Sequence, residues 1–270
     1  MSVDSQKVSE IIVECADKYI LPRYKALAQH EISAKTSPRD LVTQADLDVE
    51  EHLTRVLPDL LPGSVVIGEE AASKNPALLD QLDDKSLKIW IVDPVDGTHN
   101  FVHSKREFGV MLALIENGEA RQGWIYDVLG KEMTVAERGG GAFVGSQKLK
   151  VNPQNDARKL HGHINPGFFP KQYRDHIHNA VKKFGGTRSM ACAAHEYLRV
   201  AKGEAQFCIY SRLKPWDHVA GALIVEEAGG YAATWSGERY KPQDRDTGLI
   251  VAAGEKDWQE VYNVLLKDVL

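Results

Sequence analysis

The fold is decided by the stretch Ile89-Trp-Ile-Val-Asp-Pro-Val-Asp-Gly-Thr98. Its first four residues form a short apolar run bounded by turn residues, which predicts a buried strand. Pro94 fixes one backbone dihedral and Gly97 allows a positive φ, so the chain bends as it leaves that strand. The strand therefore delivers Asp93 straight out of an apolar core, and Asp96 follows three residues later. Carboxylates delivered in this way rarely lack a partner.

Patterns on both sides of this strand predict a strand-rich N-terminal half. Apolar residues at helical spacing indicate amphipathic helices over residues 8–27 and 43–57, with a polar loop at 35–40 between them. Thr43 and Asp46 are expected to cap the second helix where it begins. Short apolar runs predict further strands at 65–67, 109–115, 122–126, 132–136 and 141–144, with hairpin turns at 116–118 and 128–130.

The C-terminal half has a different sequence of predicted elements, because helical and strand patterns alternate along it. We place the seam between the halves at residues 150–158, which divides the chain into residues 1–150, helices plus an antiparallel sheet, and residues 151–270, an α/β half. In the second half, helices are predicted at 173–184, 193–201, 217–228 and 258–266, and strands at 205–210, 231–234 and 249–252.

The composition is that of a globular protein with ordinary charge. A chain of 270 residues with 43% hydrophobic residues can bury a full core. The net charge of -5 is not concentrated in blocks, which argues against nucleic-acid binding. Three cysteines without a metal-binding spacing indicate a reducing cytoplasm. The polar opening segment and the shortness of all apolar runs predict neither a secretory signal nor a membrane span.

Acidic residues gather at four places where strands or loops meet helices, namely residues 40–46, 69–70, 93–96 and Asp217. Each place alone is ordinary: turns contain Asp and Gly, strand ends are solvated, and helix starts favour acids because of the macrodipole. Together the four places indicate a cluster of carboxylates. Two carboxylates about 4 Å apart repel by roughly 4 kcal/mol at an effective dielectric of 20, so a cluster of four needs cations to stay ionised.

The cations that would stabilise such a cluster are Lys or Arg side chains, protonated neighbours or metal ions. Oxygen ligands without His or Cys favour a hard ion, Mg²⁺ or Mn²⁺. Two such ions about 3.5 to 4 Å apart clamp a phosphate, one generating hydroxide and the other neutralising the leaving oxygen. Backbone N–H groups of Gly97 and Thr98 beside the bend would then form an anion cradle. The residues therefore predict metal-dependent hydrolysis of a small phosphate monoester.

The acidic residues belong to four motifs that follow one another along the chain. The motifs are Asp40-Leu-Val-Thr-x-x-Asp46, Gly68-Glu-Glu70, Asp93-Pro-Val-Asp-Gly-Thr-x-Asn-Phe-Val102 and Lys214-Pro-Trp-Asp217, the last followed by Ala220-Gly-Ala-Leu-Ile-Val-Glu-Glu-Ala-Gly-Gly230. Together they resemble the inositol monophosphatase family in content, order and spacing. The resemblance spans residues 35–230, and it implies an α+β fold, a layered αβαβα sandwich of the inositol monophosphatase and fructose-1,6-bisphosphatase type. It also implies lithium-sensitive Mg²⁺ chemistry, with two or three ions per site, and a homodimer.

The resemblance also implies which residues hold metal ions. The first ion would bind Glu69, Asp93 and the carbonyl of Val95. The second would bind Asp96 and Asp217, with Asp93 as a bridge between the two ions. Most ligands would thus come from residues 1–150, while the C-terminal half would supply Asp217 and the substrate pocket.

Catalytic roles follow from the same resemblance. Thr98, hydrogen-bonded to Asp46, would orient and deprotonate the attacking water. Glu69 counts as catalytic as well as a ligand, and Lys35 would lie near a third ion, with its charge helping to neutralise phosphate; an exposed loop lysine is the alternative. The backbone of Gly97 and Thr98 would hold phosphate oxygens.

Substrate contacts are where the chain departs from the family pattern. Asp96 and the N–H of Ala193 would contact substrate as the resemblance implies. Seven residues before the last acidic ligand, however, Tyr210 replaces the usual Glu, and a phenol cannot substitute for a bidentate carboxylate acceptor. His99 stands where Thr is usual, and it either faces the substrate or occupies a strand end. His195 either lies beside the substrate or is a packing residue.

Other functions compete with this interpretation. Haloacid-dehalogenase-type phosphatases use Asp-x-Asp, whereas Asp93 and Asp96 are three apart with Pro94 between them, so the register is wrong for that chemistry. The same mechanism can act on histidinol phosphate, a sugar phosphate or a 3′-phosphonucleotide. A regulatory protein-binding role, which some members of the family have, is a further alternative.

Overall fold

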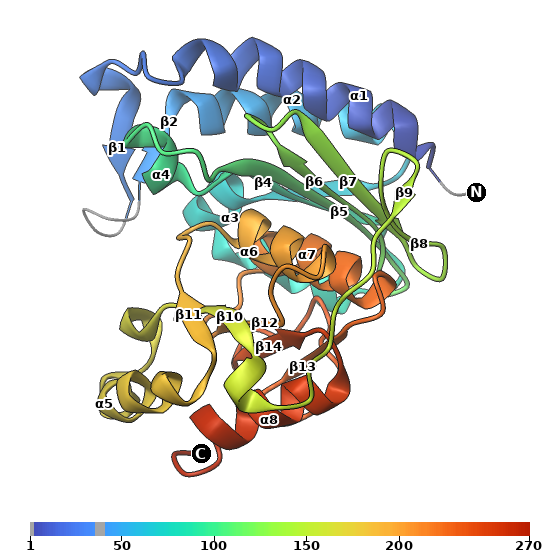
Figure 1. The fold of residues 1–270 in the computed structure, drawn as a ribbon. Helices are drawn as coiled ribbons and strands as arrows, with labels where there is room; N and C mark the ends of the chain where they lie inside the picture. The colour runs from blue at the N-terminus through green and yellow to red at the C-terminus, as the bar shows by residue number, and fades with distance from the viewer. Residues whose placement is uncertain (1–2, 36–40) are drawn as a thin grey trace.

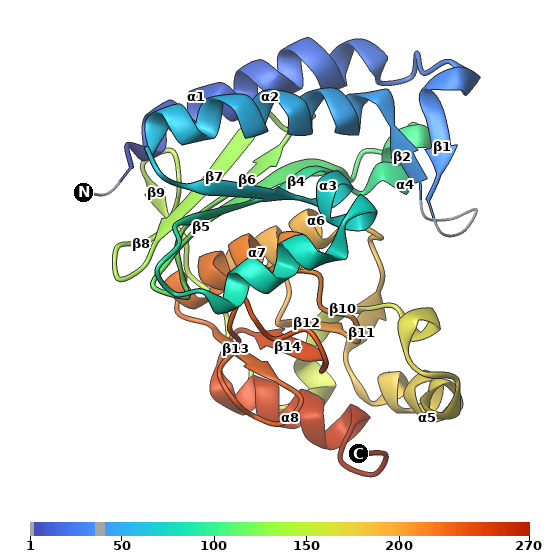
Figure 2. The ribbon, with the colours of Figure 1, turned by 180° about the vertical axis from the view of Figure 1, so that it is seen from behind.

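The computed structural model describes residues 3–35 and 41–270. Helices and sheets alternate in five layers, as Figure 1 shows. Helices α1 and α2 cover a seven-stranded sheet, α6 and α7 separate it from a five-stranded sheet, and α5 and α8 cover the far side of the second sheet. Figure 2 shows from behind that α3 belongs to the middle layer. The expected layered αβαβα sandwich is therefore confirmed.

The seven-stranded sheet has the order β3-β4-β5-β6-β7-β8-β9. β3 pairs with β4 in parallel, and the other neighbours are antiparallel. β4 is buried along its whole length. Its register with β5 shifts between Asp93 and Asp96, where Pro94 interrupts the ladder because it has no N–H. The strands are β3 Val65–Gly68, β4 Ile89–Asp96, β5 Gly109–Glu116, β6 Glu119–Asp127, β7 Glu132–Glu137, β8 Gly141–Val144 and β9 Gln147–Lys148.

The first helix begins earlier and ends earlier than the sequence predicts. α1 (Ser5–Cys15) is capped by Asp4, whose carboxylate accepts from two backbone N–H groups of the first turn. It continues as a π-helical turn (Ala16–Ile20) and a 3-10 turn (Leu21–Arg23). The helix stops there because Tyr24 is extended, so the predicted end at residue 27 is wrong.

The second helix, α2 (Gln44–Leu60), begins where the sequence predicts. Asp46 Oδ2 accepts from the N–H of Thr43 at 2.8 Å, which forms the expected cap. A hairpin of β1 (Ile32–Ala34) and β2 (Leu41–Thr43), which the sequence did not predict, precedes it. Of the predicted loop at 35–40, only Lys35 lies within the described residues.

The middle layer contains the helix with the most apolar surface. α7 is buried on all sides because it contacts strands of both sheets. Gly221 of α7 permits a close approach of α6, since a Cβ at this position would overlap the ring of Tyr197. The elements of this layer are α3 Glu69–Lys74, a 3-10 segment Pro76–Asp83, α6 Ala193–Ala201 and α7 Pro215–Glu227.

The five-stranded sheet has the order β11-β10-β12-β14-β13. β10 is parallel to both of its neighbours, whereas β14 is antiparallel to β12 and β13. β10 and β11 escaped prediction because their sequences, His-Gly-His-Ile and Gly-Thr-Arg, contain no apolar run. The elements are β10 His161–Ile164, α5 Lys171–Ala180, β11 Gly186–Arg188, β12 Phe207–Tyr210, β13 Tyr231–Thr234, β14 Leu249–Ala252 and α8 Glu255–Leu265.

Three apolar clusters fill the spaces between the layers. The largest draws residues from both parts of the chain, since it includes Ile91 of β4 and Ala222 of α7. The division at residues 150–158 therefore stays a proposal about organisation. Among the described residues, no helix is long and apolar enough to cross a membrane.

Candidate metal centre

Three acidic side chains from distant parts of the chain meet at one edge of the seven-stranded sheet. Glu69 is the first residue of α3, Asp93 lies in β4, and Asp217 lies in the first turn of α7. Because β3 and β4 are parallel, both strands end at this edge. One carboxylate oxygen of each residue lies within 4.8 Å of those of the other two. The structure thus brings together three of the four predicted acidic ligands.

Burial and mutual repulsion make this cluster unfavourable without a cation. Asp93 is 2% exposed, and its Oδ1 has no hydrogen-bond partner within the described part of the chain. Burial raises the pKa of Asp93 well above its ordinary value, and the charges of Glu69, Asp96 and Asp217 add to the shift. Burial also raises the pKa of Asp217. An unpaired buried oxygen in an all-oxygen donor set fits a hard divalent metal ion.

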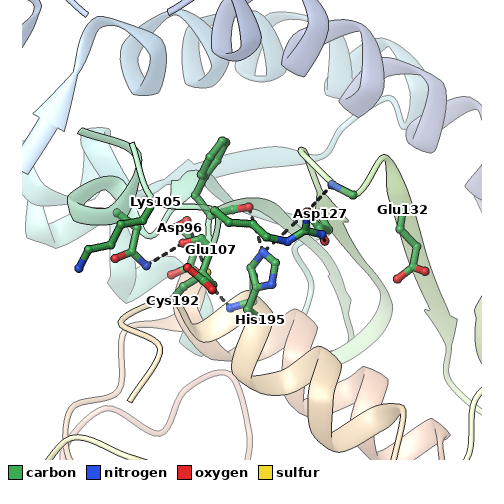
Figure 3. A network of polar contacts seen from close by, with 12 residues as sticks. Asp96, Lys105, Glu107, Asp127, Glu132, Cys192 and His195 are labelled. Carbon is green, nitrogen blue, oxygen red and sulfur yellow. Dashed lines mark hydrogen bonds and ion pairs between the residues drawn. The ribbon is translucent and has the colours of Figure 1, made fainter. Parts of the chain in front are cut away.

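Asp96 lies beside this group, but its carboxylate is not among the three that converge. Its Oδ2 accepts from the N–H of Ala194 at 2.7 Å and from the thiol of Cys192 at 2.8 Å. Figure 3 shows Asp96 next to Cys192. Burial raises the pKa of Asp96, and these donors oppose the shift. The assignment of Asp96 to a second ion stays a prediction, since one of its oxygens is already held by the segment that begins α6.

Thr98 and Asp46 form a contact that the resemblance implies. Thr98 Oγ1 lies 3.1 Å from Asp46 Oδ1 and 2.9 Å from the carbonyl oxygen of Val95. The other oxygen of Asp46 accepts from the hydroxyl of Thr43 at 2.6 Å. Burial raises the pKa of Asp46 to about 6, against the effect of the Thr43 hydrogen bonds. A carboxylate that titrates near neutrality beside a hydroxyl is suited to accept a proton.

Lys35 brings a positive charge to the acidic group. Its Nζ lies 2.8 Å from Glu69 Oε1 and 2.5 Å from Glu70 Oε1. Burial acts to lower the pKa of Lys35, but the two carboxylates outweigh it and raise the pKa above its ordinary value. Burial raises the pKa of Glu70 to about 7, although Lys35 opposes the shift. Lys35 is therefore not an exposed loop lysine, and its ammonium group neutralises part of the cluster.

Sequence reasoning missed Glu50, which supports this site from behind. Glu50 accepts from the N–H of Glu70 at 2.8 Å and from the N–H of Ala71 at 2.7 Å, so it holds the first turn of α3. It is buried, unlike most charged residues of a helix. The only signal in the sequence is that it follows Asp46 by four residues and shares its face of α2.

Gly97 has the positive φ that the turn requires. Its φ is 84°, and a Cβ there would lie 2.8 Å from the carbonyl oxygen of Glu107. The short helix α4 (Thr98–Val102) follows directly. His99 therefore lies in a helix, and its expected place at a strand end is wrong; its ring stacks on His103 with 4.2 Å between centroids.

The predicted substrate contacts offer different groups. Ala193 begins α6. Backbone hydrogen bonds from Ala193 and Ala194 to Asp96 oppose the rise in the pKa of that carboxyl group. The hydroxyl of Tyr210 donates to Glu196 Oε2 at 3.0 Å, so it is committed to a protein group. Glu196 was not singled out in the sequence. It also accepts from the N–H of Met190 at 2.9 Å, and burial raises its pKa to about 7.

His195 belongs to a polar network between α6 and the first sheet. Its Nε2 lies 3.2 Å from the carbonyl oxygen of Phe108 and 3.8 Å from Asp127 Oδ1. Arg106 reaches the other oxygen of Asp127 at 3.4 Å. Figure 3 shows His195 in one network with Asp127. These contacts favour the interpretation of His195 as a packing residue.

A groove of about 950 Å³ lies elsewhere, between α1 and the strands β7 and β8. Val13, Met133 and Phe143 line it together with acidic residues such as Glu10 and Glu14. None of the predicted site residues is among those that line this groove. Its volume therefore does not bear on the chemistry of the acidic cluster.

Comparison with known proteins gives a consistent result. The model of the inositol monophosphatase family matches residues 4–269. The chain is 34% identical over 237 residues to the inositol-1-monophosphatase of Bacillus subtilis strain 168, covering 85% of this chain and 87% of that protein. It is 31% identical over 209 residues to a Xylella fastidiosa protein named Nus factor SuhB, covering 74% and 71%. A solved structure described as 2′AMP-bound SaIMPase-II has a TM-score of 0.79 at 26% identity, covering 98% and 93%.

The fold and the acidic site define a phosphomonoesterase, a hydrolase that cleaves phosphate monoesters. The chain belongs to the inositol monophosphatase family, because the family model matches almost its whole length and a curated relative is 34% identical. The resemblance inferred from the four motifs is thereby confirmed. The individual ligand and substrate assignments stay predictions.

Proposed function

We propose that this protein hydrolyses a small phosphate monoester of the inositol monophosphate kind in a Mg²⁺-dependent reaction. The observation that carries the proposal is the convergence of Glu69, Asp93 and Asp217, whose oxygens lie within 4.8 Å of one another. Their donor set favours Mg²⁺, with Mn²⁺ as a substitute, and two or three ions per site. When bound, such ions lower the pKa of water and neutralise charge on the phosphate.

The protein's own groups position the reactants. The Thr98–Asp46 pair, 3.1 Å apart, would orient the attacking water and take its proton. Backbone N–H groups of Gly97 and Thr98 would hold phosphate oxygens at the bend, and Lys35 adds positive charge. The water oxygen bonds to phosphorus, the ester P–O bond breaks, and the leaving oxygen takes up a proton to give an alcohol.

One group expected beside the substrate differs from the family pattern. Tyr210 donates its hydroxyl proton to Glu196, and its phenol oxygen does not offer the bidentate carboxylate acceptor that two inositol ring hydroxyls would need. Histidinol phosphate, sugar phosphates and 3′-phosphonucleotides are therefore alternative substrates of the same mechanism. The similar solved structure described with bound 2′AMP supports a range of leaving groups beyond inositol.

A regulatory, protein-binding function is the second candidate. It is supported by the similarity to the protein named Nus factor SuhB. We also propose a homodimer located in the cytoplasm. The resemblance supports the homodimer, and the three free, buried cysteines suit a reducing compartment.

Phosphate release from a panel of monoesters tests the enzymatic proposal. The panel comprises inositol 1-phosphate, glycerol 2-phosphate, histidinol phosphate, fructose 1,6-bisphosphate and adenosine 3′-monophosphate. We expect turnover that requires Mg²⁺ and that Li⁺ inhibits. A metal-replete protein that turns over none of these compounds would refute the proposal and favour the regulatory function.

A further inference from the structure

Glu50 is a buried carboxylate that the chemistry proposed above does not use. It is 7% exposed, although it lies inside α2, where a charged residue normally faces solvent. The next residue of the helix, Glu51, is exposed. Because a buried carboxylate needs hydrogen-bond donors, the groups that Glu50 contacts indicate what it does.

The carboxylate of Glu50 caps a helix other than its own. Its Oε2 accepts from the N–H of Glu70 at 2.8 Å, and its Oε1 accepts from the N–H of Ala71 at 2.7 Å. N–H groups in the first turn of a helix have no partner within that helix. The residue before α3 cannot cap them, because it is Gly68 and has no side chain. Glu50 therefore supplies from α2 the cap that α3 lacks.

Gly68 and Glu50 depend on each other sterically. A Cβ at position 68 would lie 2.2 Å from the carboxyl carbon of Glu50 and 2.3 Å from its Oε2. The backbone of Gly68 is extended, with φ -96° and ψ 159°, which is a conformation that alanine also adopts. The side chain of Glu50, and not the backbone conformation, is therefore what excludes a side chain at position 68.

The turn that Glu50 holds also carries a member of the acidic group. Glu69 is the first residue of α3, and its carboxylate is one of the three whose oxygens lie within 4.8 Å of one another. The peptide unit between Glu69 and Glu70 contains the N–H that donates to Glu50. A shift of this peptide unit would move Glu69 relative to Asp93 and Asp217, which belong to β4 and α7.

The same face of α2 supports a second part of the site. Asp46 precedes Glu50 by about one helical turn, so the two side chains are neighbours. Asp46 Oδ1 accepts from Thr98 Oγ1 at 3.1 Å. One helix thus fixes the Thr98–Asp46 pair and the turn of Glu69 relative to each other.

We propose that Glu50 is a positioning residue, which sets the affinity of the acidic group for a divalent ion by fixing the turn that carries Glu69. The inference rests on the Mg²⁺-dependent activity proposed above. Glu50 acts through backbone N–H groups, whereas the converging carboxylates are those of Glu69, Asp93 and Asp217. Replacing a group that orients a metal ligand typically changes metal affinity or activity by about 10–100-fold.

The contact between Glu50 and α3 can be broken from either side. Glu50→Gln keeps the size of the side chain but replaces one oxygen with an NH₂ group, which cannot accept from a backbone N–H. Gly68→Ala keeps Glu50 but places a methyl group where its carboxylate lies. Glu50→Ala removes the cap, and the double variant Glu50→Ala/Gly68→Ala gives the added methyl group room. Glu51→Gln is the matched control, because Glu51 is the exposed neighbour on the same helix.

Two measurements give the Mg²⁺ requirement of each variant. The rise in Tm with Mg²⁺ concentration reports binding without turnover, and the Mg²⁺ dependence of phosphate release from glycerol 2-phosphate reports it in the working enzyme. We expect Glu50→Gln, Glu50→Ala and Gly68→Ala each to raise the half-maximal Mg²⁺ concentration about 10–100-fold in both measurements. KM for glycerol 2-phosphate at saturating Mg²⁺ should stay close to that of the wild type, as should every property of Glu51→Gln.

The double variant separates steric overlap from positioning. Its metal-free Tm should exceed that of Gly68→Ala, because the overlap is gone, whereas its Mg²⁺ requirement should stay high, because the cap is still missing. If Gly68→Ala does not fold, the two single variants of Glu50 decide the question.

An unchanged Mg²⁺ requirement in Glu50→Gln and Glu50→Ala would overturn the proposal, even if their metal-free Tm fell, since a cap that is merely structural affects stability alone. An equal increase in Glu51→Gln would also overturn it, because it would assign the effect to the charge of α2 in general. Either result beside normal wild-type turnover refutes this inference only. A wild type with neither turnover nor a Mg²⁺-dependent rise in Tm would refute the proposed function itself.

Discussion

Replacing Asp93 with asparagine removes one negative charge from the acidic group at almost constant volume. The oxygens of Asp93, Glu69 and Asp217 lie within 4.8 Å of one another. At that separation two unit charges repel by about 3 kcal/mol at an effective dielectric of 20. Protonation relieves part of this repulsion, because burial raises the pKa of Asp93 and of Asp217. We therefore expect Asp93→Asn to stabilise the metal-free protein by about 1–2 kcal/mol.

The pH of the assay follows from the direction of these shifts. A carboxyl group whose pKa is raised on folding binds more protons in the folded state than in the unfolded state. Its contribution to stability is present below the unfolded pKa and is lost as pH rises through the folded pKa. The destabilisation by ionised Asp93 and Asp217 is thus greatest at high pH, so the comparison is made at pH 8 in the presence of a chelator.

Thermal unfolding measures the effect. For a chain of this size about 1 kcal/mol corresponds to about 2–4 °C, so the metal-free Tm of Asp93→Asn should rise by about 2–8 °C. Mg²⁺ should raise the Tm of the wild type, because a ligand that binds only the folded state stabilises it. The variant should lose most of that rise and several orders of magnitude in kcat. Asp59→Asn, which changes an exposed carboxylate of α2, is the matched control.

Two results would refute this reasoning. A lower metal-free Tm for Asp93→Asn would show that the carboxylate of Asp93 is a structural group. Absence of any Mg²⁺-dependent rise in the wild-type Tm would contradict a metal site formed by Asp93, Glu69 and Asp217.

Three further substitutions test other parts of the site. Thr98→Ala should lower kcat by about 10²–10⁴-fold, whereas Thr98→Ser, which keeps the hydroxyl, should retain most of the rate. Steady-state kinetics measures both, and a kcat of Thr98→Ala equal to that of the wild type would exclude a proton-transfer role for Thr98. Glu196→Gln should flatten the fall in metal-free Tm between pH 4.5 and about 7. Burial raises the pKa of Glu196 to about 7, so the wild type loses the stabilising proton over that window. A Tm that falls with pH in the variant as it does in the wild type would contradict this. Gly97→Ala should destabilise the protein by about 1–3 kcal/mol in denaturant unfolding, since φ there is 84°, and a stability equal to the wild type would show that the turn relaxes.

Strands and helices with a strong apolar pattern could be predicted from the sequence. α6 (Ala193–Ala201), β13 (Tyr231–Thr234) and β14 (Leu249–Ala252) lie where their patterns place them. β10 and β11 could not be predicted, since their residues are mostly polar or glycine and their place in the sheet comes from pairing, β10 with β12 and β11 with β10. The hairpin of β1 and β2 is likewise formed by pairing between segments whose own patterns are weak.

The candidate site could be predicted only in part, for a similar reason. A carboxylate at the end of an apolar strand, such as Asp93, is visible because its neighbours have to be buried. Glu196 and Glu50 lie within helices, where a charged residue normally faces solvent, and only the packing of other elements buries them. The orientation of Asp96 could not be predicted from the sequence either, because it depends on hydrogen-bond donors in a segment about a hundred residues away.

The orientation of Asp96 depends on how the segment before α6 is held. Asn100, just after the bend, donates to the carbonyl oxygen of Met190 at 2.8 Å, and Glu196 accepts from the N–H of the same residue at 2.9 Å. The segment before α6 is therefore held by both parts of the chain. Since Ala194 at the start of α6 also fixes one oxygen of Asp96, only the other oxygen is free to serve as a ligand. On the proposed assignment of Asp96 to a metal ion and to the substrate, a change at the start of α6 is expected to alter both affinities, because Ala194 fixes the position of this carboxylate.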